Sequence, residues 1–176
     1  MYRLSQAAVA FAELDDLPDE HFPALDKGLR NLTQRHYLPP IERSGRADLY
    51  AFATISVLRL AYKATTFGLD RVQIEALTRF LQSAPLMPTR YRQRDGRREA
   101  LWVIEEAIER ARAGEDFRVG LVMGRDGRAT PKVWWQETAS PDVAAILSAN
   151  PPANADAHFS LDAGRLIREL VAKLGA

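Results

Sequence analysis

The pair Pro39-Pro40 is the feature that most limits how the N-terminal part of the chain can fold. The residue before a proline avoids the helical conformation, so a helix that approaches this pair has to end before it. The preceding residues carry an apolar stripe at spacings of four and three, formed by Leu25, Leu29 and Leu32. This spacing is typical of a helix with one buried side. We therefore predict a helix over residues 22–37 that ends at the prolines.

The other side of this expected helix is polar. At about 100° per residue, the side chains that face away from the leucines are Lys27, Arg30, Asn31 and Gln34. The major groove of DNA admits one helix, and Arg and Asn side chains can pair with guanine and adenine edges. The pattern favours a base-reading face, and a solvated polar face is the alternative.

Residues 41–50 follow the prolines and predict a short hairpin, or wing, with Ser44-Gly45 at its tip. Basic side chains beside a recognition helix position a protein on DNA through phosphate contacts, which do not read the base sequence. We expect this role for Arg35, Arg43, Arg46 and Lys63, and a hydrogen bond from the Tyr50 hydroxyl to a phosphate.

The net charge of +1 conceals an uneven distribution of charge along the chain. Residues 1–21 carry one basic side chain against five acidic ones, whereas residues 22–63 carry seven basic against three acidic. Local asymmetry of this kind matters for an anionic partner. A second basic segment, Thr89 to Arg98, follows. We expect it to be an exposed loop between domains rather than a second DNA contact.

The rest of the pattern indicates an α+β chain in two parts. Helices are predicted over 4–14, 51–68 and 70–82, the last with Asp70 and Gln73 as a capping box. The later segments predict a helix over 98–114, two strands around Asp126-Gly127, a short helix over 140–149, a polar connector over 150–157, a third strand over 158–162 and a last helix capped by Asp162. We expect a mostly helical domain over 1–85 and a small α+β domain over 86–176, with a β-hairpin and a C-terminal helix.

Residues 28–83 resemble the winged helix-turn-helix DNA-binding domain of the MerR family of bacterial transcription regulators. The matching features, in chain order, are Leu29-Arg30, Tyr37-Leu38-Pro39-Pro40, a wing with Arg43, Gly45 and Arg46, the closing Tyr50, and the helix junction Phe67 to Ile74. The resemblance implies a sequence-specific transcription regulator that binds double-stranded DNA in the bacterial cytoplasm, and not an enzyme.

Members of that family usually dimerise through a long helix after the winged domain, and the helix expected from residue 98 is too short for this role. We therefore expect a homodimer held by the C-terminal domain on a palindromic or repeated site. The expected interface consists of Leu166, Leu170 and Leu174 on the last helix, with Trp134 and Trp135. For the tryptophans, burial in the core and an effector pocket are the alternatives.

Several classes of site lack the residues that they need. The chain has no cysteine, which excludes disulfides, thiolate metal sites and cysteine nucleophiles. The three histidines lack metal-ligand spacing, and Glu105, Glu106 and Glu109 are expected on the solvated face of a helix. No apolar run approaches the roughly 20 residues of a membrane span. We expect no metal, no cofactor and no membrane partner, and the sequence identifies no small-molecule effector.

Two other classes of function remain open at the level of sequence. One is an excisionase-like or architectural DNA-binding protein of a mobile element, since similar winged heads occur there. The other is a protein-interaction or small-molecule-binding module that uses the tryptophans. Salt dependence separates DNA binding from the last class, because binding through several phosphates weakens steeply as salt rises.

Overall fold

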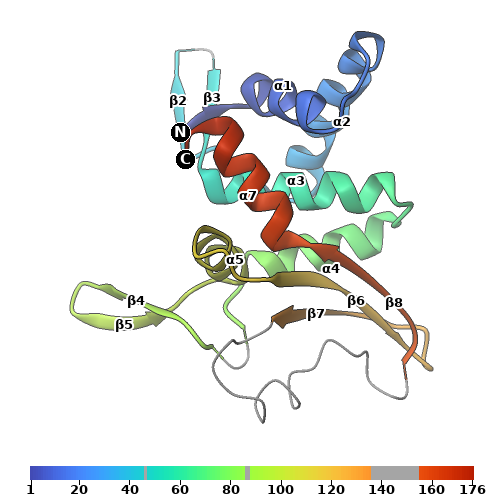
Figure 1. The fold of residues 1–176 in the computed structure, drawn as a ribbon, viewed down its shortest axis with the longest axis vertical. Helices are drawn as coiled ribbons and strands as arrows, with labels where there is room; N and C mark the ends of the chain where they lie inside the picture. Colours follow the sequence, from blue (N-terminus) through green and yellow to red (C-terminus); the bar gives the residue numbers. More distant parts are fainter. Residues whose placement is uncertain (46, 86–87, 136–154) are drawn as a thin grey trace.

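The structure is a computed structural model that describes residues 1–45, 47–85, 88–135 and 155–176. The first elements are β1 (Tyr2–Arg3), α1 (Leu4–Leu14), the 3-10 turn η1 (Asp19–His21), α2 (Phe22–Arg35), β2 (Glu42–Ser44), β3 (Ala47–Tyr50), α3 (Phe52–Thr66) and α4 (Arg71–Leu81). The later elements are β4 (Tyr91–Arg94), β5 (Arg97–Ala100), α5 (Val103–Arg112), β6 (Phe117–Gly124), β7 (Ala129–Trp135), β8 (Ala155–Asp162) and α7 (Ala163–Leu174). The chain is α+β, as expected (Figure 1).

Three expectations fall wholly or partly outside the described residues. These are the phosphate contact of Arg46, the short helix over 140–149, and the polar connector up to residue 154. Elsewhere the expected helices and strands are present, with two shifts in their ends: α5 begins five residues later than expected, and β8 begins at Ala155, so the end of the expected connector is strand.

The N-terminal sheet joins the start of the chain to the expected wing. Strand β3 lies between β2 and β1, with Arg43 opposite Asp48 and Tyr2 opposite Tyr50. Gly45 has a φ of +63° in the turn between β2 and β3, a backbone conformation that glycine adopts at little cost. The hairpin predicted over 41–50 is therefore confirmed, and pairing with β1 ties it to the first residues of α1.

A second antiparallel sheet, in the order β7-β6-β8, lies under α5 and α7. Gly120 on the central strand faces the backbone of β8 so closely that a Cβ there would overlap the carbonyl oxygen of Phe159. Strand β8 leads directly into α7, where the Asp162 carboxylate accepts a hydrogen bond from the backbone N–H of Arg165 at 2.9 Å. The cap predicted for the last helix is therefore confirmed.

One hydrophobic core runs through both halves of the chain. Helix α7 packs on α1, α3 and α5, while α4 packs on α5, β6 and β7. The same buried cluster contains Leu58 of α3, Ile104 of α5 and Ile167 of α7. The expected boundary near residue 85 therefore does not separate two cores, because apolar faces on its two sides are buried against each other.

The leucines and Trp135 of the expected dimer interface pack in this core, whereas Trp134 is half-buried and does not belong to the cluster. Leu166 and Leu170 have exposed fractions of 3% and 0%, and Leu174 packs at the edge of the cluster. The ring of Trp135 is half-buried and stacks on Phe117, with centroids 6.2 Å apart. The apolar stripe of α7 faces its own chain and so cannot hold a second copy.

The basic segment after residue 88 is a hairpin rather than the expected loop. Strands β4 and β5 pair around Asp95 and Gly96, whose φ values of +50° and +75° are those of a tight two-residue turn. Because β5 takes up residues 97–100, helix α5 begins at Val103, later than expected.

The expected solvated face of α5 is only partly solvated, because one of its three glutamates is buried. Glu106 is buried and accepts hydrogen bonds from Arg110 at 2.9 Å and from Thr89 at 2.5 Å. Burial of both charges is tolerated because each has a partner. Within the described ranges, every helix is too short or too polar to cross a bilayer.

Candidate nucleic-acid interface

Helix α2 has the two-sided character that its sequence indicates. Leu25, Leu29 and Leu32 are buried against α1 and α3. On the opposite side Lys27, Arg30 and Gln34 are exposed and Asn31 is half-buried. Arg35 in the last turn is also exposed. The structure therefore places the expected base-reading residues together on one accessible helix face.

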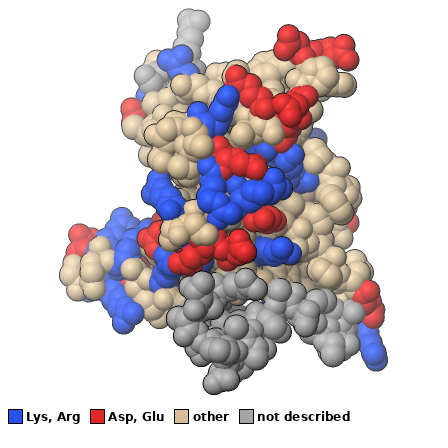
Figure 2. Space-filling view, viewed as in Figure 1, with Lys and Arg blue, Asp and Glu red and all other residues tan. Residues whose placement is uncertain are grey.

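The polar face of α2 is acidic near its N-terminal end and becomes more positive toward its C-terminal end. At the N-terminal end, Asp19 and Glu20 of η1 are exposed, and acidic side chains gather in this part of the molecule in Figure 2. In the middle of the helix, Arg30 donates to Asp26 one turn before it, with 2.9 Å between Nε and Oδ2. Exposed pairs of this kind are worth about 0–1 kcal/mol. Arg30 can therefore leave Asp26 for a base edge or a phosphate at small cost.

The wing presents a similar pair. Arg43 on β2 lies directly across from Asp48 on β3, with 2.8 Å between Nε and Oδ1, and its side chain is 77% exposed. The ion pair restrains the Arg43 guanidinium on the surface of the hairpin and leaves it exposed. Arg43 is thus accessible to a phosphate, in keeping with the role expected from the sequence.

Two apolar side chains missed by the sequence reasoning lie at the junction between α2 and the wing. Tyr37 is 77% exposed and has a positive φ of 50°, and Ile41 is 61% exposed. Neither residue forms part of a helical or alternating pattern, so periodicity gives no signal for them. They add apolar surface beside the polar face of α2.

Tyr50 does not join this surface. Its side chain lies in the core with an exposed fraction of 5%, and burial together with the Asp48 charge raises the pKa of its hydroxyl. The hydroxyl faces Thr33 on α2 rather than solvent. Tyr50 therefore packs in the core between the wing and α2, and its burial does not favour the phosphate contact that we expected.

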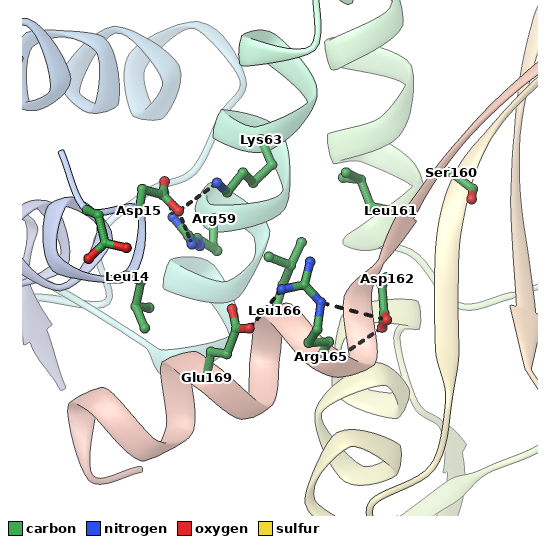
Figure 3. Close-up of a pocket in the computed structure, with 11 residues that line it drawn as sticks. Leu14, Asp15, Arg59, Lys63, Ser160, Leu161, Asp162, Arg165, Leu166 and Glu169 are labelled. Atoms are coloured by element: carbon green, nitrogen blue, oxygen red, sulfur yellow. Dashed lines mark hydrogen bonds and ion pairs between the residues drawn. The ribbon is translucent and has the colours of Figure 1, made fainter.

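Lys63 is also engaged elsewhere. Its Nζ lies 2.6 Å from Oδ1 of Asp15, and the same carboxylate accepts two hydrogen bonds from Arg59 at 2.6 and 2.7 Å (Figure 3). Desolvation alone would raise the pKa of Asp15, but the hydrogen bonds and positive charges of Arg59 and Lys63 lower it overall. Asp15 is therefore ionised, and Lys63 serves as its partner.

This ion cluster borders a cavity of about 430 Å³ between the first helices and α7. The far wall is formed by Asp162, Arg165 and Glu169, whose side chains pair with one another (Figure 3). Four acidic and three basic side chains line the cavity, so it has no preference for an anion. Sequence reasoning missed the cluster, although Arg59 lies four residues after Ile55 on the buried side of α3.

No family model, curated protein or solved structure matches the chain. In the part of the chain that the structure describes, the histidines and carboxylates form no cluster of metal-ligand type. The case for a function therefore rests on the geometry of α2 and the wing.

Proposed function

We propose that this protein binds double-stranded DNA in a sequence-specific manner, with α2 in the major groove and the β2–β3 wing on the phosphate backbone. One observation carries the proposal: an exposed polar helix face, built on a buried leucine stripe, is followed directly in the chain by a hairpin that holds an accessible arginine. Transcription regulation is the function that best fits such an interface on a chain of this size.

The residues of this surface divide into two roles. Lys27, Arg30, Asn31 and Gln34 are placed to meet base edges, and each correct bidentate contact is worth about 1–3 kcal/mol of discrimination. Arg35 and Arg43 are placed to contact phosphates, and we assign the same role to Arg46 from its position in the sequence. Tyr50 and Lys63 support the interface from within.

We further propose that two copies act together on a palindromic or repeated site. A single copy of α2 makes few base contacts. These are too few to distinguish one site from the many competing sequences of a genome. The surface that joins the copies has to differ from the α7 stripe, since Leu166 and Leu170 are buried. An architectural or excisionase-like protein would bind DNA with the same helix and wing. The symmetry of the bound site separates the two classes, because a regulator should occupy a symmetric or repeated site.

Fluorescence anisotropy with a random-sequence duplex tests the DNA-binding part of the proposal. We expect the affinity to fall steeply between roughly 50 and 200 mM salt. Arg43→Ala should flatten the slope of log K against log salt by about 0.9. Tyr50→Phe is the matched control in the same hairpin and should leave the slope unchanged, because the Tyr50 side chain is uncharged and is only 5% exposed. Absence of binding at the lowest salt would contradict the proposal.

A further inference from the structure

The β4–β5 hairpin is an arginine-rich arm that stands apart from the interface described above. The ten residues from Thr89 to Arg98 contain five arginines and one acidic residue. The two strands pair with each other and extend away from the helices as a separate arm (Figure 1). Figure 2 shows basic side chains along this projection. The rest of the fold does not need such an arm for its core, because β4 and β5 contribute no side chain to the buried cluster.

The base of the arm is fixed to the body of the protein by ion pairs. Arg92 donates to Glu99 across the hairpin, at 2.9 Å, and to Glu105 on α5. Arg90 reaches Glu115 at 2.6 Å. These contacts use the carboxylates near the base and set the direction of the hairpin. The arm is therefore held in place rather than free to swing.

The tip of the arm places like charges side by side. Arg94 and Arg97 are a directly opposed cross-strand pair on either side of the Asp95-Gly96 turn, and both are exposed. Like charges directly opposite one another destabilise a hairpin. Arg94 lies 4.0 Å from Glu99, whose carboxylate is already bonded to Arg92, and no described carboxylate lies within 4.0 Å of the Arg97 guanidinium. An anion between the two guanidinium groups would relieve this repulsion.

The other face of the arm carries an arginine on an aromatic ring. The guanidinium of Arg98 lies 3.9 Å from the centre of the Tyr91 ring, and the Tyr91 side chain is 41% exposed. The ring fixes the plane of the guanidinium while its N–H groups stay available. A planar guanidinium held in this way suits bidentate contacts with phosphate oxygens.

We propose that the β4–β5 arm is a second phosphate-binding surface, which contacts the DNA backbone outside the site read by α2. This inference rests on the proposed function for its choice of DNA as the polyanion. The arm contributes affinity and salt dependence but no base preference, because phosphate contacts do not read sequence. Arg94, Arg97 and Arg98 are the contact residues.

The test compares two double variants that each remove two arginines from a hairpin tip. The first is Arg94→Ala/Arg97→Ala in the arm. The second is Arg125→Ala/Arg128→Ala at the β6–β7 turn, which is also an exposed Asp-Gly turn. On a long random-sequence duplex, we expect the arm variant to lose about 1.8 from the salt slope and at least about tenfold in affinity near 0.1 M salt. The β6–β7 variant should match the wild type, and Arg94→Lys/Arg97→Lys should keep the wild-type slope.

Folding is not a confounding factor in this comparison, since removal of two opposed charges should leave the melting temperature unchanged or raise it. An arm variant with wild-type slope and affinity would overturn the inference, as would an equal loss in the β6–β7 variant. Loss of binding to vesicles containing phosphatidylserine, with DNA binding intact, would also overturn it in favour of a membrane surface. A different result would show that the proposed function fails while this inference holds. Substitutions in α2 would then leave the base preference unchanged, and the arm variant would still reduce the salt slope of DNA binding.

Discussion

Arg59 and Asp15 form a bidentate ion pair, with 2.7 Å from Nη1 to Oδ2 and 2.6 Å from Nη2 to Oδ1. The pair joins the end of α1 to the middle of α3, and the Arg59 side chain is only 1% exposed. Asp15 stands in the turn that leads from α1 toward α2, so the pair fixes how the proposed recognition helix leaves α1. The position of the proposed DNA-reading face therefore depends on this buried contact.

Asp15→Asn should therefore destabilise the protein strongly. Loss of one partner from a buried ion pair leaves the other charge uncompensated, at a cost of about 3–5 kcal/mol in the free energy of unfolding. Lys63→Met is the control, because Lys63 contacts the same carboxylate but is 29% exposed and should cost less. Urea unfolding followed by circular dichroism measures both. Equal small losses in the two variants would contradict a structural role for the Arg59–Asp15 pair.

His36, at the end of α2, should make stability depend on pH. Burial lowers its pKa below the ordinary value of 6.5, with the nearby arginines adding to the shift against the Glu75 charge. The unfolded state therefore binds a proton more readily, and stability is complete above about pH 6.5 and lost as the pH falls below it. His36→Gln should remove this loss, whereas His158→Gln, at an exposed position, should retain it. Thermal melts between about pH 5.5 and 7.5, one pH unit on either side of the ordinary histidine pKa, make the comparison.

Gly120→Ala should prevent normal packing of the β7-β6-β8 sheet. The added Cβ would overlap the carbonyl oxygen of Phe159 on β8, and backbone atoms held in the pairing of β6 with β8 cannot move aside cheaply. We expect a loss of more than about 4 kcal/mol, or failure to fold. Gly28→Ala in α2 is the control, since open space surrounds that position and alanine favours a helix by up to about 1 kcal/mol. A stable, cooperatively melting Gly120→Ala protein would contradict the described sheet register.

A fragment of residues 1–85 should not fold on its own. The sequence pattern favours a boundary there, but α3 and α4 bury side chains against α5, α7 and β6. The fragment would expose Leu58, Leu60 and Leu77, which are fully buried in the intact chain. Circular dichroism and thermal melting of the fragment test this expectation. A sharp melting transition with native helix content would show instead that the two parts are independent.

Local signals predicted the elements well. The leucine stripe and the proline pair gave α2 nearly to its ends, and the Asp70–Gln73 capping box is present with hydrogen bonds of 2.8 and 3.0 Å. These features depend on residues within one or two turns of each other, so the sequence carries the whole signal. The Asp95-Gly96 turn carries the same signal as Asp126-Gly127, and the abundance of arginine obscured it.

Long-range partners could not be predicted in the same way. Arg59 and Asp15 are 44 residues apart, and only the packing of α1 on α3 brings them together. The stripe of α7 is a similar case, because periodicity identifies an apolar face without saying whether it meets its own chain or a second copy. Tyr50 was expected to contact a phosphate because it ends the basic wing, whereas in the structure it pairs with Tyr2 of β1 and is buried.

Selection of bound duplexes from a random-sequence pool tests most directly the claim that α2 reads DNA. The wild type and Asn31→Ala/Gln34→Ala should be carried through the same selection, since both side chains lie on the polar face of α2 and neither is charged. We expect the wild type to enrich one motif, and the variant to lose preference at one or two positions while it keeps the remainder. No enriched motif with the wild type, or an identical motif with the variant, would contradict the account.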